Sequence, residues 1–274
     1  MLKLMATSDS YRTYSGIIKE ICDELNIECE TFADEWVFKL TKGNMTRIIL
    51  GYRFGLNDEV SSLLCNDKSV TFNILKSYDI PVVPHFFFQA DYGCEGRISE
   101  DDRKWLLNLL SDYRKLVLKP NDGNGGKNVF LVDEPSSLLE TASRIFGLTE
   151  YMAVSPYYDI QREYRLILLN GELRIAYHKQ RMSGEWRHNL GLGAKACLSG
   201  MSEIEKDVLP LAKEATEKLG LKFASVDIIR CPDKRCGIME INSGVMMAFF
   251  AAESSEYRSM AKAVYKDVIE EMFA

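Results

Sequence analysis

The stretch from residue 152 to 181 constrains the fold more than any other part of the sequence. It contains three short runs of strand-forming residues, at 152–158, 163–170 and 173–181. The last two are joined by Asn-Gly-Glu (170–172), which favours a tight β-hairpin. Strands joined by so short a turn run antiparallel, so the chain is not a repetition of right-handed βαβ units.

The other segments alternate between helical and extended patterns. Helices are expected over 10–25, 69–78, 99–113, 136–146, 202–219 and 255–273. Strands are expected over 2–7, 27–32, 46–52, 115–120, 129–132, 222–230 and 236–243. Pro81 and Pro84 favour an extended segment over 79–88. This mixture predicts an α+β fold.

The charge balance excludes some classes of partner. The chain has 34 Lys and Arg against 40 Asp and Glu, a formal charge of −6, whereas general nucleic-acid binding needs a basic surface. The longest apolar run covers eight residues, 245–252, and a membrane helix needs about 20. We therefore expect neither a nucleic-acid partner nor a membrane partner. The N-terminus also lacks the apolar core of a signal peptide.

The seven cysteines are odd in number and scattered, as expected of reduced thiols in a cytoplasmic protein. Cys231 and Cys236 are the one close pair. The Pro-Asp-Lys-Arg between them is typical of a hairpin turn, and we favour that interpretation over a zinc site.

A glycine-rich loop follows the predicted strand 115–120. The sequence from Lys119 to Lys127 reads KPNDGNGGK. Glycines let backbone N–H groups approach a phosphate closely, although a plain hairpin loop explains the composition as well. The loop is not a Walker motif, because no helix and no Lys-Ser/Thr ending follow.

Two later strands carry a set of oxygen ligands. Asp227 lies in VDII, and Glu240 and Asn242 lie in MEIN, where alternation along a strand turns both to the same face. If the two strands pair, Asp227 can lie beside them. Two carboxylates and one amide oxygen suit Mg²⁺ that is also bound by phosphates, and a solvated polar face is the alternative.

A basic stretch lies between these features. It contains Arg174, Lys179, Arg181 and Arg187, and it precedes GLGAKA (191–196). Such a run is usually a solvated surface, but a loop over an anionic group fits as well.

These features in this order resemble the ATP-grasp superfamily, in the branch of glutathione synthetase and the ribosomal-protein glutamate ligases. The resemblance covers roughly residues 66–250. The matching segments are NDKSVTFNILKSYDIPVVPH (66–85), LVLKPNDGNGGKNVFLV (116–132), AVSPYYDIQREYRLILLNGEL (153–173), RMSGEWRHNLGLGA (181–194) and VDII…MEINSG (226–244).

The resemblance implies roles for individual residues. Lys68 and Lys119 would contact the nucleotide phosphates. The loop residues Asn121, Gly123, Gly125, Gly126 and Lys127 would close over them. Val154, Ser155 and Tyr157 would form the adenine hinge, although Pro156 between them lacks an N–H. Glu163 and Arg165 would lie beside the nucleotide. Arg187, Asn189 and Arg181 would act in catalysis, and Asp227, Glu240 and Asn242 would bind magnesium.

The resemblance also implies an organisation and an activity. It divides the chain into a short N-terminal α/β domain (1–66), a linker helix with the lid subdomain (67–153) and a C-terminal subdomain with the metal site (154–274). The activity is that of an ATP-dependent carboxylate–amine ligase, with an acyl-phosphate intermediate and ADP and phosphate as products. ATP and two Mg²⁺ ions, with Mn²⁺ as a substitute, would be the cofactors. A small-molecule or peptide carboxylate and an amine would be the partners, and a homodimer is common among relatives.

Two other activities fit the same motifs: a kinase-like phosphotransferase and a non-catalytic nucleotide-binding module. The identity of the acid and the amine is not encoded in any motif. Arg12, Arg47 and Arg53 are available to receive a substrate carboxylate, and a surface role is the simpler expectation for each.

Overall fold

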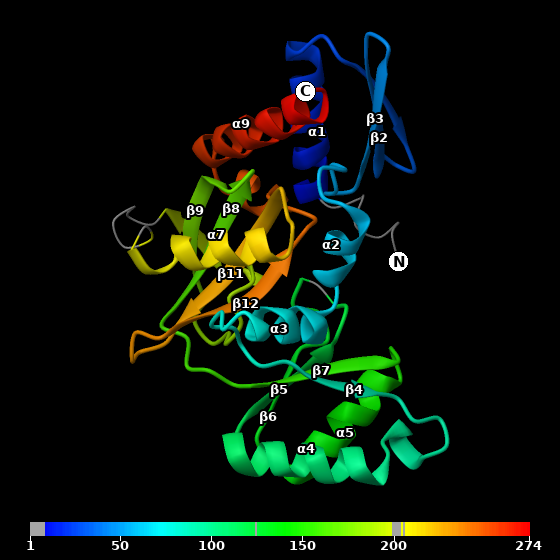
Figure 1. The fold of residues 1–274 in the computed structure, drawn as a ribbon, viewed down its shortest axis with the longest axis vertical. Helices are drawn as coiled ribbons and strands as arrows, with labels where there is room; N and C mark the ends of the chain where they lie inside the picture. The colour runs from blue at the N-terminus through cyan, green and yellow to red at the C-terminus, as the bar shows by residue number, and fades with distance from the viewer. Residues whose placement is uncertain (1–8, 124, 199–203, 205) are drawn as a thin grey trace. The chain divides into compact units, whose positions relative to one another are not determined.

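The computed structural model describes residues 9–123, 125–198, 204 and 206–274 (Figure 1). The chain forms two compact units. One contains residues 1–62, 164–227 and 241–274, and the other contains 63–163 and 228–240. We call them the first and the second unit. The three-domain division expected from the sequence stays a prediction.

The first unit begins with a helix on a small sheet. Helix α1 (Asp9–Glu24) is followed by β1 (Glu28–Phe32), β2 (Val37–Lys42) and β3 (Met45–Leu50), which form an antiparallel sheet in the order β1-β2-β3. Ile18 and Ile21 of α1 are buried in one cluster with Phe38, Leu40 and Ile49 of the sheet. The expected helix 10–25 and two of the strands are confirmed, whereas β2 was not predicted. The strand expected at 2–7 lies outside the described residues.

A five-stranded sheet has the order β10-β9-β8-β11-β12. Its strands are β8 (Arg162–Leu169), β9 (Glu172–Gln180), β10 (Lys195–Leu198), β11 (Phe223–Arg230) and β12 (Cys236–Asn242). Asn170 and Gly171 turn β8 into β9 with φ of 53° and 74°, and these positive φ values are the reason that Asn-Gly favours such a hairpin. Helix α7 (Leu209–Lys218) precedes β11.

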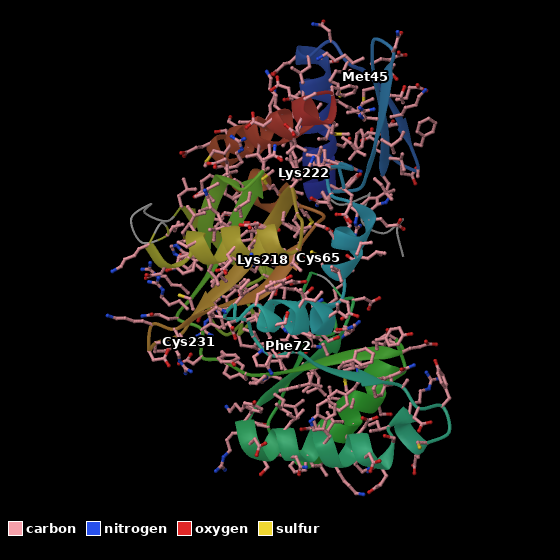
Figure 2. All side chains as sticks on the ribbon, in the orientation of Figure 1. Met45, Cys65, Phe72, Lys218, Lys222 and Cys231 are labelled. Atoms are coloured by element: carbon pink, nitrogen blue, oxygen red, sulfur yellow. The ribbon has the colours of Figure 1, made fainter. Side chains whose placement is uncertain are left out.

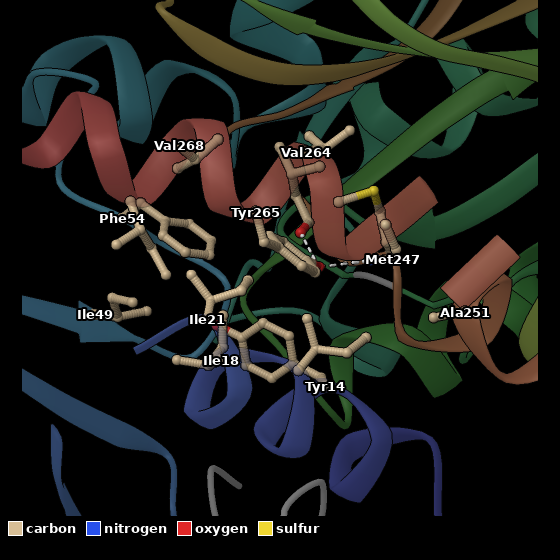
Figure 3. Packing of buried hydrophobic residues seen from close by; sticks show 14 of the residues in the cluster. Tyr14, Ile18, Ile21, Ile49, Phe54, Met247, Ala251, Val264, Tyr265 and Val268 are labelled. Carbon is tan, nitrogen blue, oxygen red and sulfur yellow. Dashed lines mark hydrogen bonds between the residues drawn. The ribbon is translucent and has the colours of Figure 1, made fainter. Parts of the chain in front are cut away.

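Two C-terminal helices complete the core of the first unit. Helices α8 (Ala248–Glu253) and α9 (Ser255–Met272) contribute Ala251, Val264, Tyr265 and Val268 to the same cluster as α1 (Figure 3). On the exposed side, Glu20 of α1 pairs with Arg258 and Lys262 of α9, and Glu24 pairs with Lys262 and Lys266. The two ends of the chain therefore share one hydrophobic core.

The second unit has its own sheet, in the order β4-β7-β5-β6. The strands are β4 (Phe86–Gln89), β5 (Leu116–Pro120), β6 (Phe130–Val132) and β7 (Tyr151–Pro156). Helices α4 (Glu100–Tyr113) and α5 (Pro135–Phe146) cover one face (Figure 1), where Leu118, Met152 and Val154 lie in a shared cluster with Leu106 and Ile145. The short elements α2 (Glu59–Leu64), η2 (Glu95–Arg97) and η3 (Leu190–Leu192) lie elsewhere in the chain.

Helix α3 (Lys68–Ser77) also belongs to the second unit. Its N-cap Asp67 accepts a hydrogen bond from the N–H of Val70, as the sequence predicts. Phe72, labelled in Figure 2, packs edge-on against Phe86 of β4 with ring centroids 6.4 Å apart.

Two further expectations concern cysteines and membranes. All seven cysteines lie in the described part of the chain and none forms a disulfide. The N–H of Cys231 donates to the carbonyl of Arg235 and the N–H of Lys234 to that of Cys231, which confirms a hairpin turn.

Within the described residues, no helix has both the length and the apolar character needed to cross a membrane.

Candidate active site

Lys68 opens α3 and its charge is turned inward, with 7% of the side chain exposed. Its Nζ donates hydrogen bonds to the carbonyl oxygens of Asn121, at 3.3 Å, and Gly123. It also lies 3.4 Å from Oε1 of Glu240. A residue predicted to bind phosphate thus meets the start of the glycine-rich loop and a predicted metal ligand.

Lys119 of β5 is a second buried lysine, and it interacts electrostatically with Lys68 and Glu240. Leu118 faces the core under α4 and α5, so the alternation of β5 turns Lys119 to the opposite face of the sheet. Burial and the positive charge of Lys68 lower the pKa of Lys119 to about 8, although Glu240 and Glu163 act in the opposite direction. The positive charges of the two buried ammonium groups repel each other, and a bound polyanion would relieve that repulsion.

A buried histidine lies beside the two lysines. His85 is 2% exposed, and its Nδ1 lies 2.9 Å from the carbonyl oxygen of Val83, to which it donates. Burial and the charges of Lys119 and Lys68 lower the pKa of His85 well below its usual value, so the ring is neutral. Its Nε2 has no hydrogen-bond partner in the part of the chain that the structure describes.

Asn121 fixes the entry of the glycine-rich loop. Its Oδ1 accepts a hydrogen bond from the N–H of Ser69 at 3.2 Å, and its own N–H donates to the carbonyl of Tyr151. Beyond it, Gly125 and Gly126 have φ of 66° and 72°, values that favour glycine. Lys127 is exposed. The loop therefore has a fixed start and an exposed centre.

The predicted adenine hinge lies in β7. Val154 pairs with Phe86 of β4 and with Leu118 of β5, so it is flanked by strands on both sides. The N–H of Tyr157 donates to the carbonyl oxygen of Lys115 at 3.0 Å. In this structure that N–H is used by the protein, and Ser155 is paired in the same ladder with Val117 of β5, so the hinge assignment stays a prediction.

Asp227, in the first unit, is held by two cations. Arg165 of β8 donates to it through Nε at 2.9 Å and through a terminal nitrogen at 2.5 Å. Nζ of Lys179 on β9 lies 2.9 Å from Oδ1. Burial alone would raise the pKa of Asp227, but the charges of Arg165 and Lys179 and their hydrogen bonds lower it to about 2. The carboxylate therefore stays ionised, as a metal ligand must.

The contacts of Asp227 with Arg165 and Lys179 use only part of the hydrogen-bonding capacity of its carboxylate. An ionised carboxylate offers about four lone-pair sites. Oδ1 accepts from both Arg165 and Lys179, whereas Oδ2 accepts from Arg165 alone among the described contacts.

Glu240 and Asn242 are two residues apart on β12, and β11, which carries Asp227, is its neighbour in the sheet. The two strands do pair, which was the condition for Asp227 to lie beside Glu240 and Asn242. The described residues contain no group of three or more His, Cys, Asp or Glu side chains that could hold a metal. The proposed set has two carboxylates and an amide oxygen, a combination that fits Mg²⁺ when phosphates supply further ligands.

The three predicted catalytic residues after β9 have different surroundings. Arg187 is held by Glu185, with Nε 3.0 Å from Oε1 and a terminal nitrogen 2.8 Å from Oε2. The carbonyl of Asn189 closes the turn η3 by accepting from the N–H of Leu192. Arg181 is exposed, one residue after β9 ends.

Comparison with known proteins identifies the family of this chain. The sequence model described as a RimK-like ATP-grasp domain matches residues 98–257, more than half of the chain. The chain belongs to the RimK-like ATP-grasp family. The matched range includes Lys119, the glycine-rich loop, and the strands that carry Asp227 and Glu240.

Curated relatives of this ATP-grasp chain are named probable alpha-L-glutamate ligases. The protein of that name from Enterobacter sp. (strain 638) is 26% identical over 196 residues, which cover 69% of this chain and 59% of the relative. The one from Xanthomonas oryzae pv. oryzae (strain MAFF 311018) is 30% identical over 146 residues, or 52% and 48% of the two chains. The chain thus spans about 59% of the length of the Enterobacter relative.

Solved structures show the same fold at low sequence identity. D-alanine–D-alanine ligase from Bacillus anthracis superposes with a TM-score of 0.61 at 17% identity, covering 79% of this chain and 70% of that one. A bifunctional glutathione synthetase from Pasteurella multocida gives a TM-score of 0.55 at 14% identity, covering 92% and 44%. The predicted α+β ATP-grasp fold is confirmed.

Two contacts of this ATP-grasp domain were not predicted. Lys179 was assigned to a basic stretch, but it lies on the same face of β9 as buried Ile175 and Tyr177. An inward lysine on an apolar face needs a carboxylate partner, and this pattern could have indicated the contact with Asp227. Glu185, two residues before Arg187, could likewise have been recognised as its partner.

Proposed function

We propose that this chain is an ATP-dependent ligase that joins a carboxylate to an amine and releases ADP and phosphate. The main observation behind this proposal is the pair of buried lysines, Lys68 and Lys119, which lie with Glu240 beside the glycine-rich loop. Membership of the RimK-like ATP-grasp family supports the ligase activity. The relatives' name makes L-glutamate the first amino acid to test.

The proposed reaction has two steps. A carboxylate oxygen of the acid substrate attacks the γ-phosphorus of ATP, the bond between that phosphorus and the β–γ bridging oxygen breaks, and ADP leaves. The amine of the second substrate, after losing a proton to solvent, attacks the carbonyl carbon of the acyl phosphate. Phosphate leaves with one oxygen that came from the acid, and an amide bond remains.

The protein's part is charge neutralisation and positioning. Lys68 and Lys119 would bind ATP phosphates, and Arg187, aligned by Glu185, would neutralise the transferring phosphoryl group. Asp227, Glu240 and Asn242 would hold Mg²⁺, which when bound neutralises phosphate charge. Closing the glycine-rich loop would exclude water, which otherwise hydrolyses an acyl phosphate.

An isotope experiment tests the proposal. The protein is incubated with ATP, Mg²⁺ and L-glutamate labelled with ¹⁸O in its carboxyl groups, and then with a mixture of the twenty amino acids in place of glutamate. We expect ADP, an amide product and phosphate carrying one ¹⁸O from the labelled acid. AMP with pyrophosphate would contradict the proposal. A phosphorylated product without an amide would indicate a phosphotransferase, and nucleotide binding without turnover would indicate a binding module.

A matched variant links this activity to the lysine pair. Lys119→Met keeps the length and the apolar stem of the side chain but removes the charge, and it should weaken ATP binding. Lys127→Met, on the exposed part of the loop, tests whether the centre of the loop also contacts the phosphates.

A further inference from the structure

His85 is a buried histidine of the second unit to which the reaction proposed above gives no role. Its Nδ1 donates to the carbonyl oxygen of Val83 at 2.9 Å, so Nε2 carries a lone pair and can act only as an acceptor. Nε2 is buried and has no hydrogen-bond partner within the described residues. Buried acceptors in folded proteins are almost always paired, because an unpaired one is costly. This nitrogen therefore needs an explanation.

The backbone before His85 is fixed to the strand that carries Glu240. The N–H of Val83 donates to the carbonyl oxygen of Ile238 at 2.8 Å, and the N–H of Ile238 donates to that of Pro81 at 2.9 Å. Ile238 is two residues before Glu240 on β12, and all of these residues belong to the second unit. Val83 thus fixes the chain through its N–H and the imidazole ring through its carbonyl, so Nε2 has a defined position.

The sheet of the second unit turns His85 and Lys119 to the same side. Strand β4 begins directly after His85. Phe86 and Phe88 of this strand pack in the cluster with α4 and α5, so alternation turns His85 to the opposite face. Lys119 of β5 also faces away from that cluster, because its neighbour Leu118 lies in it.

Small side chains lie between these two residues. Strand β7 separates β4 from β5 in the sheet. On it, Ala153 pairs with Lys119, and Ser155 is the next residue on the same face, and both are buried. The lysine stem and the imidazole ring can therefore approach each other above β7. In agreement, the charge of Lys119 lowers the pKa of His85 more than the charge of Lys68 does.

A neutral acceptor suits a lysine that binds phosphate. A carboxylate partner would neutralise the ammonium group and would also repel the phosphate. An imidazole nitrogen offers a lone pair without a charge, so it can orient Nζ of Lys119 and leave the positive charge available for an anion. Burial and the nearby lysines hold the pKa of His85 well below its usual value, which keeps the ring neutral at pH 7.

We propose that Nε2 of His85 accepts a hydrogen bond from Nζ of Lys119 when ATP is bound, and thereby holds the ammonium group at the phosphates. His85 is then a positioning residue, which acts through Lys119 and does not touch ATP. The inference rests on the proposed ligase function, in which Lys119 binds ATP phosphates, and it adds a residue to that site.

Two substitutions separate the two ring nitrogens. In His85→Asn the amide nitrogen can keep the hydrogen bond to Val83, but no atom reaches the place of Nε2. In His85→Gln the amide oxygen can take the place of Nε2 and accept in its stead. Calorimetric titration with ATP and Mg²⁺, without any amino acid, measures binding. His85→Asn should raise Kd for ATP about 10- to 100-fold, the range for a hydrogen bond to a charged group, and His85→Gln should stay within about threefold of the wild type.

A double-mutant cycle tests whether His85 acts through Lys119. Once Lys119→Met has removed the ammonium group, His85→Asn should raise Kd by less than about twofold further, because coupled residues are not additive. His178→Asn is the control histidine variant. His178 belongs to the first unit and lies on the face of β9 opposite to Lys179, so its Kd for ATP should equal that of the wild type.

The outcomes separate the two proposals. A wild-type Kd in His85→Asn, an equal loss in both His85 variants, or a loss that adds in full to that of Lys119→Met overturns the role of His85 and leaves the ligase function intact. An unchanged Kd in Lys119→Met, or no ATP binding by the wild type, overturns the proposed nucleotide site and the inference with it. Circular dichroism of each variant confirms that binding is measured on a folded protein.

Discussion

Asp227 and its two cations allow a test in which two partners of one buried cluster are removed separately. Arg165, Lys179 and Asp227 together carry a net charge of +1, and the side chains of Lys179 and Asp227 are each 4% exposed. Asp227→Asn keeps the shape but leaves two cations facing each other. Lys179→Met leaves a neutral pair, because Arg165 still binds Asp227 through two hydrogen bonds.

The expected costs differ for this reason. Removing one member of a buried ion pair and leaving uncompensated charge costs about 3–5 kcal/mol, and for a chain of this size that lowers Tm by about 6–10 °C. Methionine replaces the lysine stem with an apolar group of similar volume, so Lys179→Met should cost within about 1.5 kcal/mol. The ranking of the two variants follows from the charge that each substitution leaves unbalanced inside the folded protein.

The pH dependence gives a second readout. The pKa of Asp227 is lowered from 3.8 to about 2, so the folded state binds this proton less readily than the unfolded state does. The corresponding stability, about 2 kcal/mol, is fully present above pH 4 and is lost as the pH falls towards 2. The Asp227→Asn variant should lack this part of the acid dependence.

Urea unfolding at pH 7 and at several values between 4 and 2.5, followed by circular dichroism, measures both effects. Equal losses of stability in Asp227→Asn and Lys179→Met would refute the charge argument. An acid dependence that is unchanged in Asp227→Asn would refute the assignment of the lowered pKa.

Three other predictions concern single sites. Glu240→Ala should abolish ADP formation and still fold, since its side chain is 27% exposed; retained turnover in a coupled ADP assay would remove it from the proposed metal site. Because the pKa of Lys119 is about 8, ATP binding at pH 8 should be accompanied by proton uptake, visible in calorimetry as a heat that changes with the ionisation enthalpy of the buffer, and Lys119→Met should abolish that change. Gly51→Ala should cost about 2–4 kcal/mol, because φ is +57° and a Cβ would lie 2.5 Å from the Trp36 ring. Gly43→Ala, at φ +58° with nothing within 4 Å, should cost only about 1 kcal/mol, and equal values by urea unfolding would contradict the clash.

The parts of the fold that follow from local signals were predicted well. The Asn170-Gly171 turn fixed the hairpin of β8 and β9, since positive φ at both positions is a backbone requirement that the sequence displays. Helices α1, α3, α4, α5 and α9 have apolar spacing or caps that can be recognised in one dimension. The short elements β2, β10 and α8 were missed because a segment of four to six residues owes its structure to its neighbours.

The site was harder to predict than the fold. Residue types and order identified Asp227, Glu240 and Asn242 as oxygen ligands, and these assignments remain predictions. The partners of Asp227 were not foreseen, because they depend on the register between strands that are far apart in the sequence.

The hydroxyl of Tyr265 donates to the carbonyl of Val245 and accepts from the N–H of Met247 (Figure 3). Tyr265 lies beyond residue 257, where the match to the family ends. A fragment trimmed to the matched residues would therefore lose the side chain that anchors the segment 245–247, which follows β12. It would keep Lys119 and would also lose Lys68, which precedes residue 98.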